Sequence, residues 1–503
     1  MSDQSPPISV SGQSSNDKAI TVGTGTTGSS SVWLIAARIV AQITNLILLL
    51  IAARVLSPAE LGAFALTSAV GMILLQCAET GWYQYISSQP EKNALHPTVF
   101  WLGTFSGLAW VSLGLLAALM IWLGWHAPNY ALVMVLLSSL GFFAAVTSLQ
   151  FGVIMRRGNV TRISQIGIAS ELLGFSIGAV ALLAGAGVFA LAFHKTLTHL
   201  TTSVLSVAIA RWLPAFDMTW SKVREILTFV RELLLGRTGG LVQNYSSDFL
   251  VGALLGAAEV GYYRAGIRFV GAVNEVLTEP LRVLAWTVLP KATEQTPSHT
   301  TSQRSQTLED FVLIISAVAL PCYVGMAMVA KDLIVVLLGP GWGPAVTVMV
   351  IFCAVRLLLS LRALVEPVLS LGNALSVLPR FVVLSMILSI GLFLAIGHRG
   401  LMEAALSQAI AAILLLPVII LIFMKYGNLN IRSVITSLLG PVFAVLAMTG
   451  ALLYLNNLLW IADLQPIARL PILVLAGASA YAIALFCIAR DTIRNAFDRI
   501  NAL

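Results

Sequence analysis

Residues 38–62, RIVAQITNLILLLIAARVLSPAELG, recur in outline as residues 237–261, RTGGLVQNYSSDFLVGALLGAAEVG. Aligned without gaps, the two segments share six identities in 25 positions, and several fall on polar residues that a membrane helix does not carry by default. The polar identities are Arg38 with Arg237, Asn45 with Asn244, and Glu60 with Glu259. A membrane protein that contains the same polar helix twice is typical of a transporter.

The composition is that of a polytopic helical membrane protein. Hydrophobic residues make up 58% of the 503 residues and charged residues only 10%. Apolar runs of about 20 residues recur as far as the C-terminus, which exceeds what a soluble core of this length would use. We expect about fourteen transmembrane helices, at residues 31–53, 62–88, 98–123, 129–155, 163–184, 187–210, 228–253, 261–289, 310–330, 344–371, 377–397, 401–424, 434–456 and 470–489.

The repeat divides these helices into two halves. Because six membrane crossings separate the two copies, both copies run in the same direction and the halves are parallel repeats. The expected fold class is an all-α polytopic membrane protein with two parallel six-helix repeats around a central cavity and two additional C-terminal helices. The expected divisions are a disordered cytoplasmic tail at 1–30, an N-terminal lobe at 31–210, a cytoplasmic linker at 211–227, a C-terminal lobe at 228–424, two additional transmembrane helices at 425–489 and a cytoplasmic tail at 490–503.

The distribution of Lys and Arg predicts the orientation, because cytoplasmic loops retain positive charge. With the N-terminus inside, sixteen basic residues lie in cytoplasmic segments and four in external ones. Both termini are therefore expected in the cytoplasm. The same bias explains much of the net charge of +7, which indicates topology and some affinity for anionic membrane lipids, and not nucleic-acid binding.

The sequence leaves no room for a soluble catalytic domain, since no loop after the N-terminal tail exceeds about 20 residues. It contains neither a phosphate-binding GxxxxGK[ST] motif nor a metal-binding HExxH motif. The four cysteines fall within the expected helices without paired spacing, as small packing residues do. We therefore expect no catalytic residue, no cofactor and no metal, and a protein that is not an enzyme.

Charged residues inside the expected helices carry the functional information. Each costs at least ~2.5 kcal/mol at a helix centre unless it faces a cavity or a partner. Five of them follow one another in span 261–289 at intervals of four, seven, four and three residues, and so share one stripe of the helix. They are Arg264, Arg268, Glu275, Glu279 and Arg282. The side chains that we expect to bind substrate are Arg38, Asn45, Arg237, Asn244, Arg264, Arg268, Arg282, Arg356 and Arg362.

An alternative is that these charges only pair with one another and tie helices together. Arg268 could pair with Glu275 in this way, and Arg362 with Glu366. The arginines outnumber the acids that could neutralise them on the same faces, which favours an electropositive cavity between the lobes. For three further residues the sequence leaves ion pairing and cavity lining equally open: Glu171, His194 and Lys195.

Two segments resemble a known family. They are residues 37–66, ARIVAQITNLILLLIAARVLSPAELGAFAL, and residues 244–269, NYSSDFLVGALLGAAEVGYYRAGIRF, which is followed by VLP at 288–290. They are similar to the Wzx-type polysaccharide biosynthesis, or lipid-linked oligosaccharide, flippases of bacteria. These belong to the multidrug/oligosaccharidyl-lipid/polysaccharide (MOP) superfamily, and the resemblance covers roughly residues 31–430.

The resemblance implies a location in the bacterial inner membrane and twelve core helices in two lobes around an alternating-access cavity. It implies an undecaprenyl-pyrophosphate-linked oligosaccharide as the substrate, for O-antigen or exopolysaccharide synthesis, with the basic cavity residues on its pyrophosphate or anionic sugars. The arginines in the expected helices are consistent with such a substrate, because arginine offers planar, permanently charged contacts to phosphate oxygens. The resemblance also leaves room for contact with a polysaccharide polymerase or with export machinery.

Two other functions are weighed against flipping. A cation-coupled multidrug exporter of the same superfamily would be expected to line its cavity with acids and aromatic residues. A membrane glycosyltransferase or polymerase acting on lipid-linked sugars would need catalytic residues on a sizeable external loop, and the external loops here are short.

Energy coupling needs a titratable or cation-binding acid that changes exposure, because the chain has no nucleotide site. Glu79, Asp248 and Glu275 are the expected candidates for a proton or a sodium ion. The alternative, that they are fixed partners of the neighbouring arginines, fits the sequence about as well.

Overall fold

The computed structural model describes residues 27–90, 94–294, 300–458, 461 and 463–501, and every element within them is helical. Most of the expected tail at 1–30 lies outside these residues, and its last four belong to the first helix. The α-helices are α1 (Thr27–Val55), α2 (Pro58–Glu79), α3 (Trp82–Ser88), α4 (Pro97–Trp125), α5 (Pro128–Ser138), α6 (Leu140–Arg156), α7 (Val160–Leu183), α8 (Val188–Ala210), α9 (Trp220–Leu254), α10 (Ala257–Glu294), α11 (Thr300–Met328), α12 (Ala330–Leu337), α13 (Gly343–Leu358), α14 (Val365–Leu371), α15 (Leu378–Ile396), α16 (Leu401–Gly427), α17 (Ile431–Asn456) and α19 (Pro466–Asn501). Four 3₁₀ turns connect them: η1 (Pro340–Trp342), η2 (Ser360–Leu364), η3 (Leu375–Val377) and η4 (Gly397–Arg399).

Local signals explain the break between α1 and α2. Ser57 accepts a hydrogen bond from the backbone N–H of Glu60 at 3.3 Å, and the Glu60 carboxylate accepts one from the Ser57 N–H at 2.9 Å. Together with Pro58 in the first turn, this reciprocal cap starts α2. The equivalent break before α10 uses Gly256, whose φ of +105° favours glycine.

Eleven helices in the described residues are long and apolar enough to cross a membrane. Every one of the fourteen expected spans overlaps a helix, but α8, α9 and α10 do not meet this apolar criterion, so the exact count of fourteen is not confirmed. These three helices carry Lys195, Asp248 and Arg268, among other polar residues. These polar residues explain why the three helices are less apolar than the other long helices.

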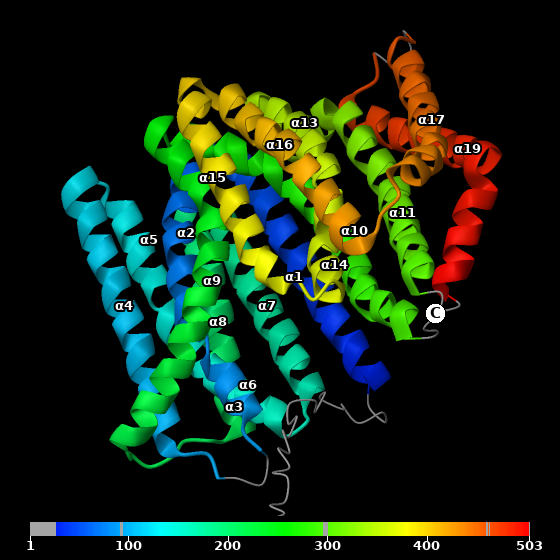
Figure 1. Cartoon of the computed structure of the whole chain (residues 1–503). Coiled ribbons are helices and arrows are strands. Elements are labelled where there is room, and N and C mark those ends of the chain that lie inside the picture. The colour runs from blue at the N-terminus through cyan, green and yellow to red at the C-terminus, as the bar shows by residue number, and fades with distance from the viewer. Residues whose placement is uncertain (1–26, 91–93, 295–299, 459–460, 462, 502–503) are drawn as a thin grey trace, which may run out of the picture.

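The helix contacts recur in the two halves of the chain, as the sequence repeat predicts. In the first half, α1 packs against α7, α2 against α6, and α7 against α8. In the second half, α9 packs against α15, α10 against α13, and α15 against α16. Figure 1 shows α4, α5 and α6 of the first half on one side and α10, α13 and α16 of the second half on the other, whereas α9 lies beside first-half helices. The expected all-α architecture of two parallel repeats is therefore confirmed.

The two halves meet most closely at a pair of repeat-related glycines on α2 and α10. A Cβ added to Gly62 would lie 1.7 Å from the carbonyl oxygen of Ala257, and one added to Gly261 would lie 2.1 Å from that of Pro58. Because each contact is the counterpart of the other, the pseudo-twofold axis passes between these helices. Only glycine permits this approach of the two backbones.

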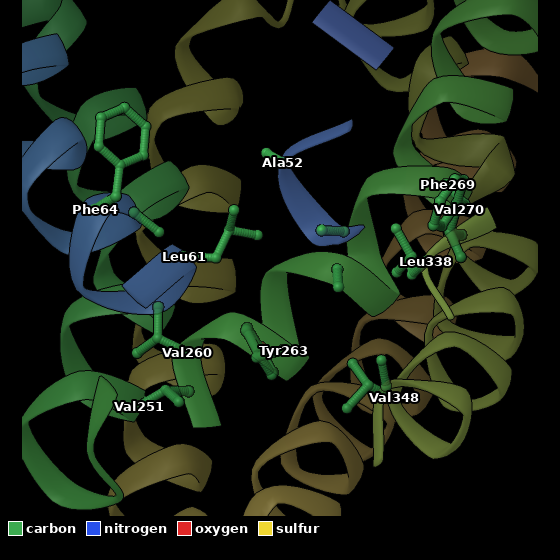
Figure 2. Packing of buried hydrophobic residues seen from close by; sticks show 14 of the residues in the cluster. Ala52, Leu61, Phe64, Val251, Val260, Tyr263, Phe269, Val270, Leu338 and Val348 are labelled. Carbon is green, nitrogen blue, oxygen red and sulfur yellow. The ribbon is translucent and has the colours of Figure 1, made fainter. Parts of the chain in front are cut away.

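The largest hydrophobic cluster surrounds this crossing and includes side chains from both halves. Leu61 and Phe64 on α2 lie near Val260 and Tyr263 on α10, and Val348 on α13 extends the cluster into the second half (Figure 2). The halves therefore share one core at this end of the molecule.

The two additional helices, α17 and α19, pack beside α11 at one edge of the molecule (Figure 1). Arg499 donates two hydrogen bonds to the buried carboxylate of Asp310, at 2.8 and 2.6 Å. At the other end of α19, Arg469 lies 3.0 Å from the buried carboxylate of Asp332 on α12. The hydrogen bonds with Asp310 raise the pKa of Arg499, so its guanidinium group stays charged.

We expect Arg499→Ala to lower the thermal unfolding temperature of the detergent-solubilised protein. It leaves the Asp310 carboxylate buried without its donors, at a cost of about 1–3 kcal/mol. Arg494→Ala is the matched control, because Arg494 and Asp498 form an exposed pair at 3.7 Å on the same helix, and such pairs contribute about 0–1 kcal/mol. Equal unfolding temperatures for the two variants would contradict this account of how α19 is held.

Candidate functional site

A cavity of about 1060 Å³ lies between the two lobes. Its wall is formed by α1, α2, α8, α9, α10, α13, η2, α14, α15 and α16. Among the described residues, six basic side chains and two carboxylates line it. The basic residues are Lys195, Arg264, Arg268, Arg282, Arg356 and Arg362, and the acidic residues are Asp248 and Glu366. The described lining residues therefore carry an excess of four formal positive charges.

Both acidic residues of the wall lie against arginines. Nε and Nη2 of Arg264 donate to Oδ2 of Asp248 at 3.0 and 2.6 Å. Nη1 of Arg282 lies 3.8 Å from Oε2 of Glu366. Two of the expected substrate-binding arginines are thus partly neutralised, and the uncompensated charge lies elsewhere on the wall.

Three basic residues carry much of this uncompensated charge: Lys195 on α8, Arg268 on α10 and Arg356 on α13. None forms a hydrogen bond or an ion pair with another described residue, and Nε of Arg356 is buried without a partner. The exposed Glu275 attracts both arginines electrostatically, but it forms no ion pair with them in the described part of the chain. These side chains come from different helices and present donors that an anion could accept.

The other residues expected from the sequence are divided between the cavity and its surroundings. Asn45 lines the cavity, as do Arg362 and the charged residues named above. Arg38, Arg237, Glu79 and Glu275 are outside the described lining. The side chain of Asn244 lies outside the described part of the structure.

The contacts of these outlying residues show where they lie. Arg38 and Arg237 are exposed, and Nη1 of Arg237 is 3.5 Å from the hydroxyl of Thr80. The amide of Gln42 donates to the carboxylate of Glu275. The cavity is bounded by the later turns of α1 and α9, where Asn45 and Asp248 lie. Positions seven or more residues earlier, such as Arg38, are about 10 Å or more further along the helix axis.

Sequence reasoning did not assign several polar lining residues. Lys195 was left open, although a lone lysine in an apolar span was the available signal. Ser389 and Gln408 gave none, because hydroxyl and amide side chains are ordinary in membrane helices. Here Ser389 donates to Gln408 at 2.6 Å across α15 and α16. This part of the wall offers polar groups of the kind that contact sugars.

The two lobes are in contact at the end where α1 meets α2. The indole N–H of the buried Trp342 donates to the carbonyl of Ala53 at 3.0 Å. Nη2 of Arg54 donates to the carbonyl of Val336 at 2.6 Å. These hydrogen bonds connect the two lobes beside the contact of Gly62 with α10. We call this end of the molecule the joined end.

Two groups of helices, related by the sequence repeat, surround a central polar cavity, an arrangement that is typical of membrane transporters. Residues 51–347, more than half of the chain, match the polysaccharide biosynthesis protein family, and the chain belongs to that family. It is 25% identical over 300 residues to the succinoglycan biosynthesis transport protein ExoT of Rhizobium meliloti (strain 1021). That alignment covers 59% of each protein, so the chain spans about three fifths of this relative's length.

Two solved structures share the fold. One is the lipid II flippase MurJ in an inward closed conformation, with a TM-score of 0.70, 13% identity, and coverage of 92% of this chain and 99% of that one. The other is an inward-facing multidrug resistance MATE family transporter of the MOP superfamily, with a TM-score of 0.59, 13% identity, and coverage of 79% and 99%. The expected membership of a polysaccharide biosynthesis protein family and the helical, multi-pass membrane fold are confirmed.

Proposed function

We propose that this transporter flips an undecaprenyl-pyrophosphate-linked oligosaccharide across the bacterial inner membrane. The observation that carries the proposal is the excess of positive charge among the described lining residues of the central cavity, above all Lys195, Arg268 and Arg356, which form no ion pair with another described residue. A diphosphate offers several anionic oxygens to which guanidinium groups bind in bidentate fashion. The family match and the transport function in the name of the relative ExoT support the same substrate class.

A multidrug exporter of cationic compounds is the second candidate, and the cavity disfavours it. Such a substrate would need acidic side chains facing the cavity. The two carboxylates among the described lining residues lie against Arg264 and Arg282. A cation would therefore meet net positive charge on entering.

Transport by alternating access would require the joined end to separate. The hydrogen bonds of Arg54 and Trp342 and the contact of Gly62 with α10 would have to break while the opposite end closes. With both termini in the cytoplasm, as the charge distribution favours, the joined end faces outward. The lobe boundaries at 31–210 and 228–424 would then mark the units that move.

A cation gradient is one possible source of direction, and Asp248, Glu275 and Glu79 are our candidates for coupling. Asp248 is bound to Arg264, which itself lines the cavity, so a substrate anion would compete for the same guanidinium. Transport into vesicles with the proton and sodium gradients collapsed separately would test this for Asp248→Asn and Glu275→Gln. Full activity without either gradient would exclude coupling through these acids.

Deletion of the gene tests the proposed function directly. We expect an undecaprenyl-pyrophosphate-linked oligosaccharide to accumulate on the cytoplasmic face, with loss of the surface polysaccharide. Reintroduction of the wild-type gene should restore both. Loss of polysaccharide without accumulation of such an intermediate would contradict flipping and would point to a role in synthesis or polymerisation.

A further inference from the structure

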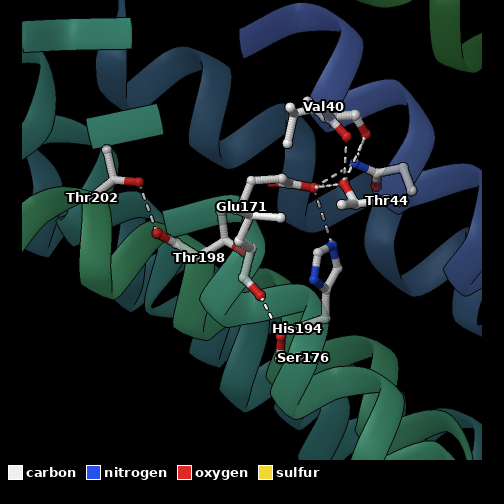
Figure 3. Close-up of polar contacts among 10 residues, drawn as sticks. Val40, Thr44, Glu171, Ser176, His194, Thr198 and Thr202 are labelled. Atoms are coloured by element: carbon white, nitrogen blue, oxygen red, sulfur yellow. Dashed lines mark hydrogen bonds and ion pairs between the residues drawn. The ribbon is translucent and has the colours of Figure 1, made fainter. Parts of the chain in front are cut away.

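The mostly buried carboxylate of Glu171 lies behind the cavity wall and has no role in the transport proposed above. Glu171 on α7 accepts hydrogen bonds at Oε1 from Thr44 Oγ1 at 3.0 Å and from Asn45 Nδ2 at 2.7 Å. Nε2 of His194 lies 3.8 Å from the same oxygen, and the side chains of His194 and Glu171 are 5% and 12% exposed. Figure 3 shows α1, α7 and α8 converging on this carboxylate.

The cluster around Glu171 is incompletely satisfied. Within the described part of the chain, the hydroxyl of Ser170, the residue before Glu171, is buried and has no hydrogen-bond partner. In the described part of the chain, no lysine or arginine lies within ion-pair distance of Glu171. A mostly buried acid that is bound by neutral donors and has no such cation within ion-pair distance is well placed to change its protonation state.

Lys195 links this carboxylate to the cavity. It lines the cavity with its neighbour His194 and with Asn45, whereas Glu171 lies behind them. Glu171 attracts the ammonium group, and Arg264 and Arg268 on α10 repel it. The ammonium group of Lys195 thus interacts both with the carboxylate behind the wall and with the arginines of α10.

The other titratable groups near Glu171, His194 and Lys195 are His199 and Asp248. His199 on α8 interacts electrostatically with Lys195 and His194. Asp248 on α9 is bound to Arg264. The residues of α1 that contact Glu171 are the neutral Thr44 and Asn45. Glu171 is therefore the acid whose charge depends most directly on Lys195.

We propose that Glu171 is a proton-binding site whose occupancy is linked to that of the central cavity, an inference that rests on the proposed function. In the empty cavity the ionised carboxylate offsets the charge of Lys195. A diphosphate on Arg268 and Arg356 draws Lys195 toward itself and adds negative charge beside Glu171, which then takes a proton from cavity water onto its carboxylate oxygen. Because coupling between two ligands is reciprocal, the proton in turn strengthens diphosphate binding.

The geometry fits a proton better than a metal ion. Thr44 and Asn45 are hydrogen-bond donors to Glu171, and the described residues contain no group of three or more His, Cys, Asp or Glu side chains that could hold a metal. Hard cations prefer a shell of several oxygen ligands. A single carboxylate among donors instead provides an acceptor for one proton.

Binding measurements at a series of pH values test this linkage on the full-length protein. The probe is a short prenyl-diphosphate-linked monosaccharide, whose esterified phosphates lack the proton that titrates near pH ~6 in a phosphate monoester. The wild type should bind it more tightly as the pH falls, approaching about a tenfold gain in affinity per pH unit, because one proton enters with the ligand. Glu171→Gln should bind with a pH-independent affinity close to that of the protonated wild type.

Two matched variants locate the proton. Glu366→Gln removes a carboxylate that does line the cavity, and His194→Gln removes the neighbouring base, and both should keep the pH dependence. A pH dependence that survives in Glu171→Gln or disappears in His194→Gln would overturn the assignment, and so would an affinity that depends on sodium and not on pH. Binding without any pH dependence would contradict this inference alone, whereas no binding at any pH would contradict the proposed function.

Discussion

Arg268→Ala and Arg356→Ala are each expected to reduce polysaccharide export at least ~tenfold with the protein still present in the membrane. Each side chain lines the cavity and forms no hydrogen bond or ion pair with another described residue. A hydrogen bond between charged groups contributes about 1.5–3 kcal/mol. The lysine variants should restore export only in part, because an ammonium group cannot make the bidentate contact. Export would be measured as surface polysaccharide per unit of membrane-inserted protein.

Arg380→Ala is the matched control for these variants. Arg380 is an exposed arginine of the same lobe that is not among the described lining residues. Its removal should leave export close to the wild-type level. If the alanine variants of Arg268, Arg356 and Lys195 all export normally at normal abundance, the cationic cavity does not bind the substrate.

Gly62→Ala is expected to cause the second large loss of export. The added Cβ would lie 1.7 Å from the carbonyl oxygen of Ala257, so α2 and α10 could no longer approach and the joined end could not close. An external thiol reagent should then reach a cysteine introduced at Ser68, which lines the cavity, in a cysteine-free background. We expect export to fall at least about tenfold, which corresponds to about 1.4 kcal/mol. Faster labelling of this cysteine together with that loss would show that the external end is open.

The control for this variant lies on the same pair of helices. Gly271 on α10 has no atom within 4 Å of an added Cβ. Gly271→Ala should therefore be neutral or slightly stabilising, because alanine restricts the unfolded chain more than glycine does. Labelling and export that are the same in the two variants would show that the contact at Gly62 does not keep this end closed.

Much of the architecture could be predicted because its signals are local or periodic. Hydropathy located the helices, and the repeat of residues 38–62 at 237–261 predicted paired lobes, which the recurring helix contacts confirm. The cap of α2 by Ser57 and Glu60 is likewise a short-range pattern. The number of membrane spans was less accessible, because polar helices such as α8 lose the hydropathy signal when they line a cavity.

The candidate site could be predicted only in outline. Helical spacing placed Arg264, Arg268 and Arg282 on one stripe, and all three line the cavity. It did not show that Asp248 would bind Arg264, since the two residues are on different helices. Nor did helical spacing show that the amide of Asn45 donates to Glu171, unlike lining arginines such as Arg268 that form no hydrogen bond with another described residue.

The sequence by itself determined that this chain is a helical, duplicated membrane protein with far more arginine in its helices than nearby acids could neutralise. Hydropathy, composition and repeats are properties of the chain that need no knowledge of which helices touch. Only the tertiary structure decided which charges remain uncompensated, because pairing depends on distances of a few ångströms between residues such as Arg264 and Asp248. It also brought Glu171, His194 and Lys195 together at one wall of the cavity, where packing of α1, α7 and α8 sets the electrostatic environment.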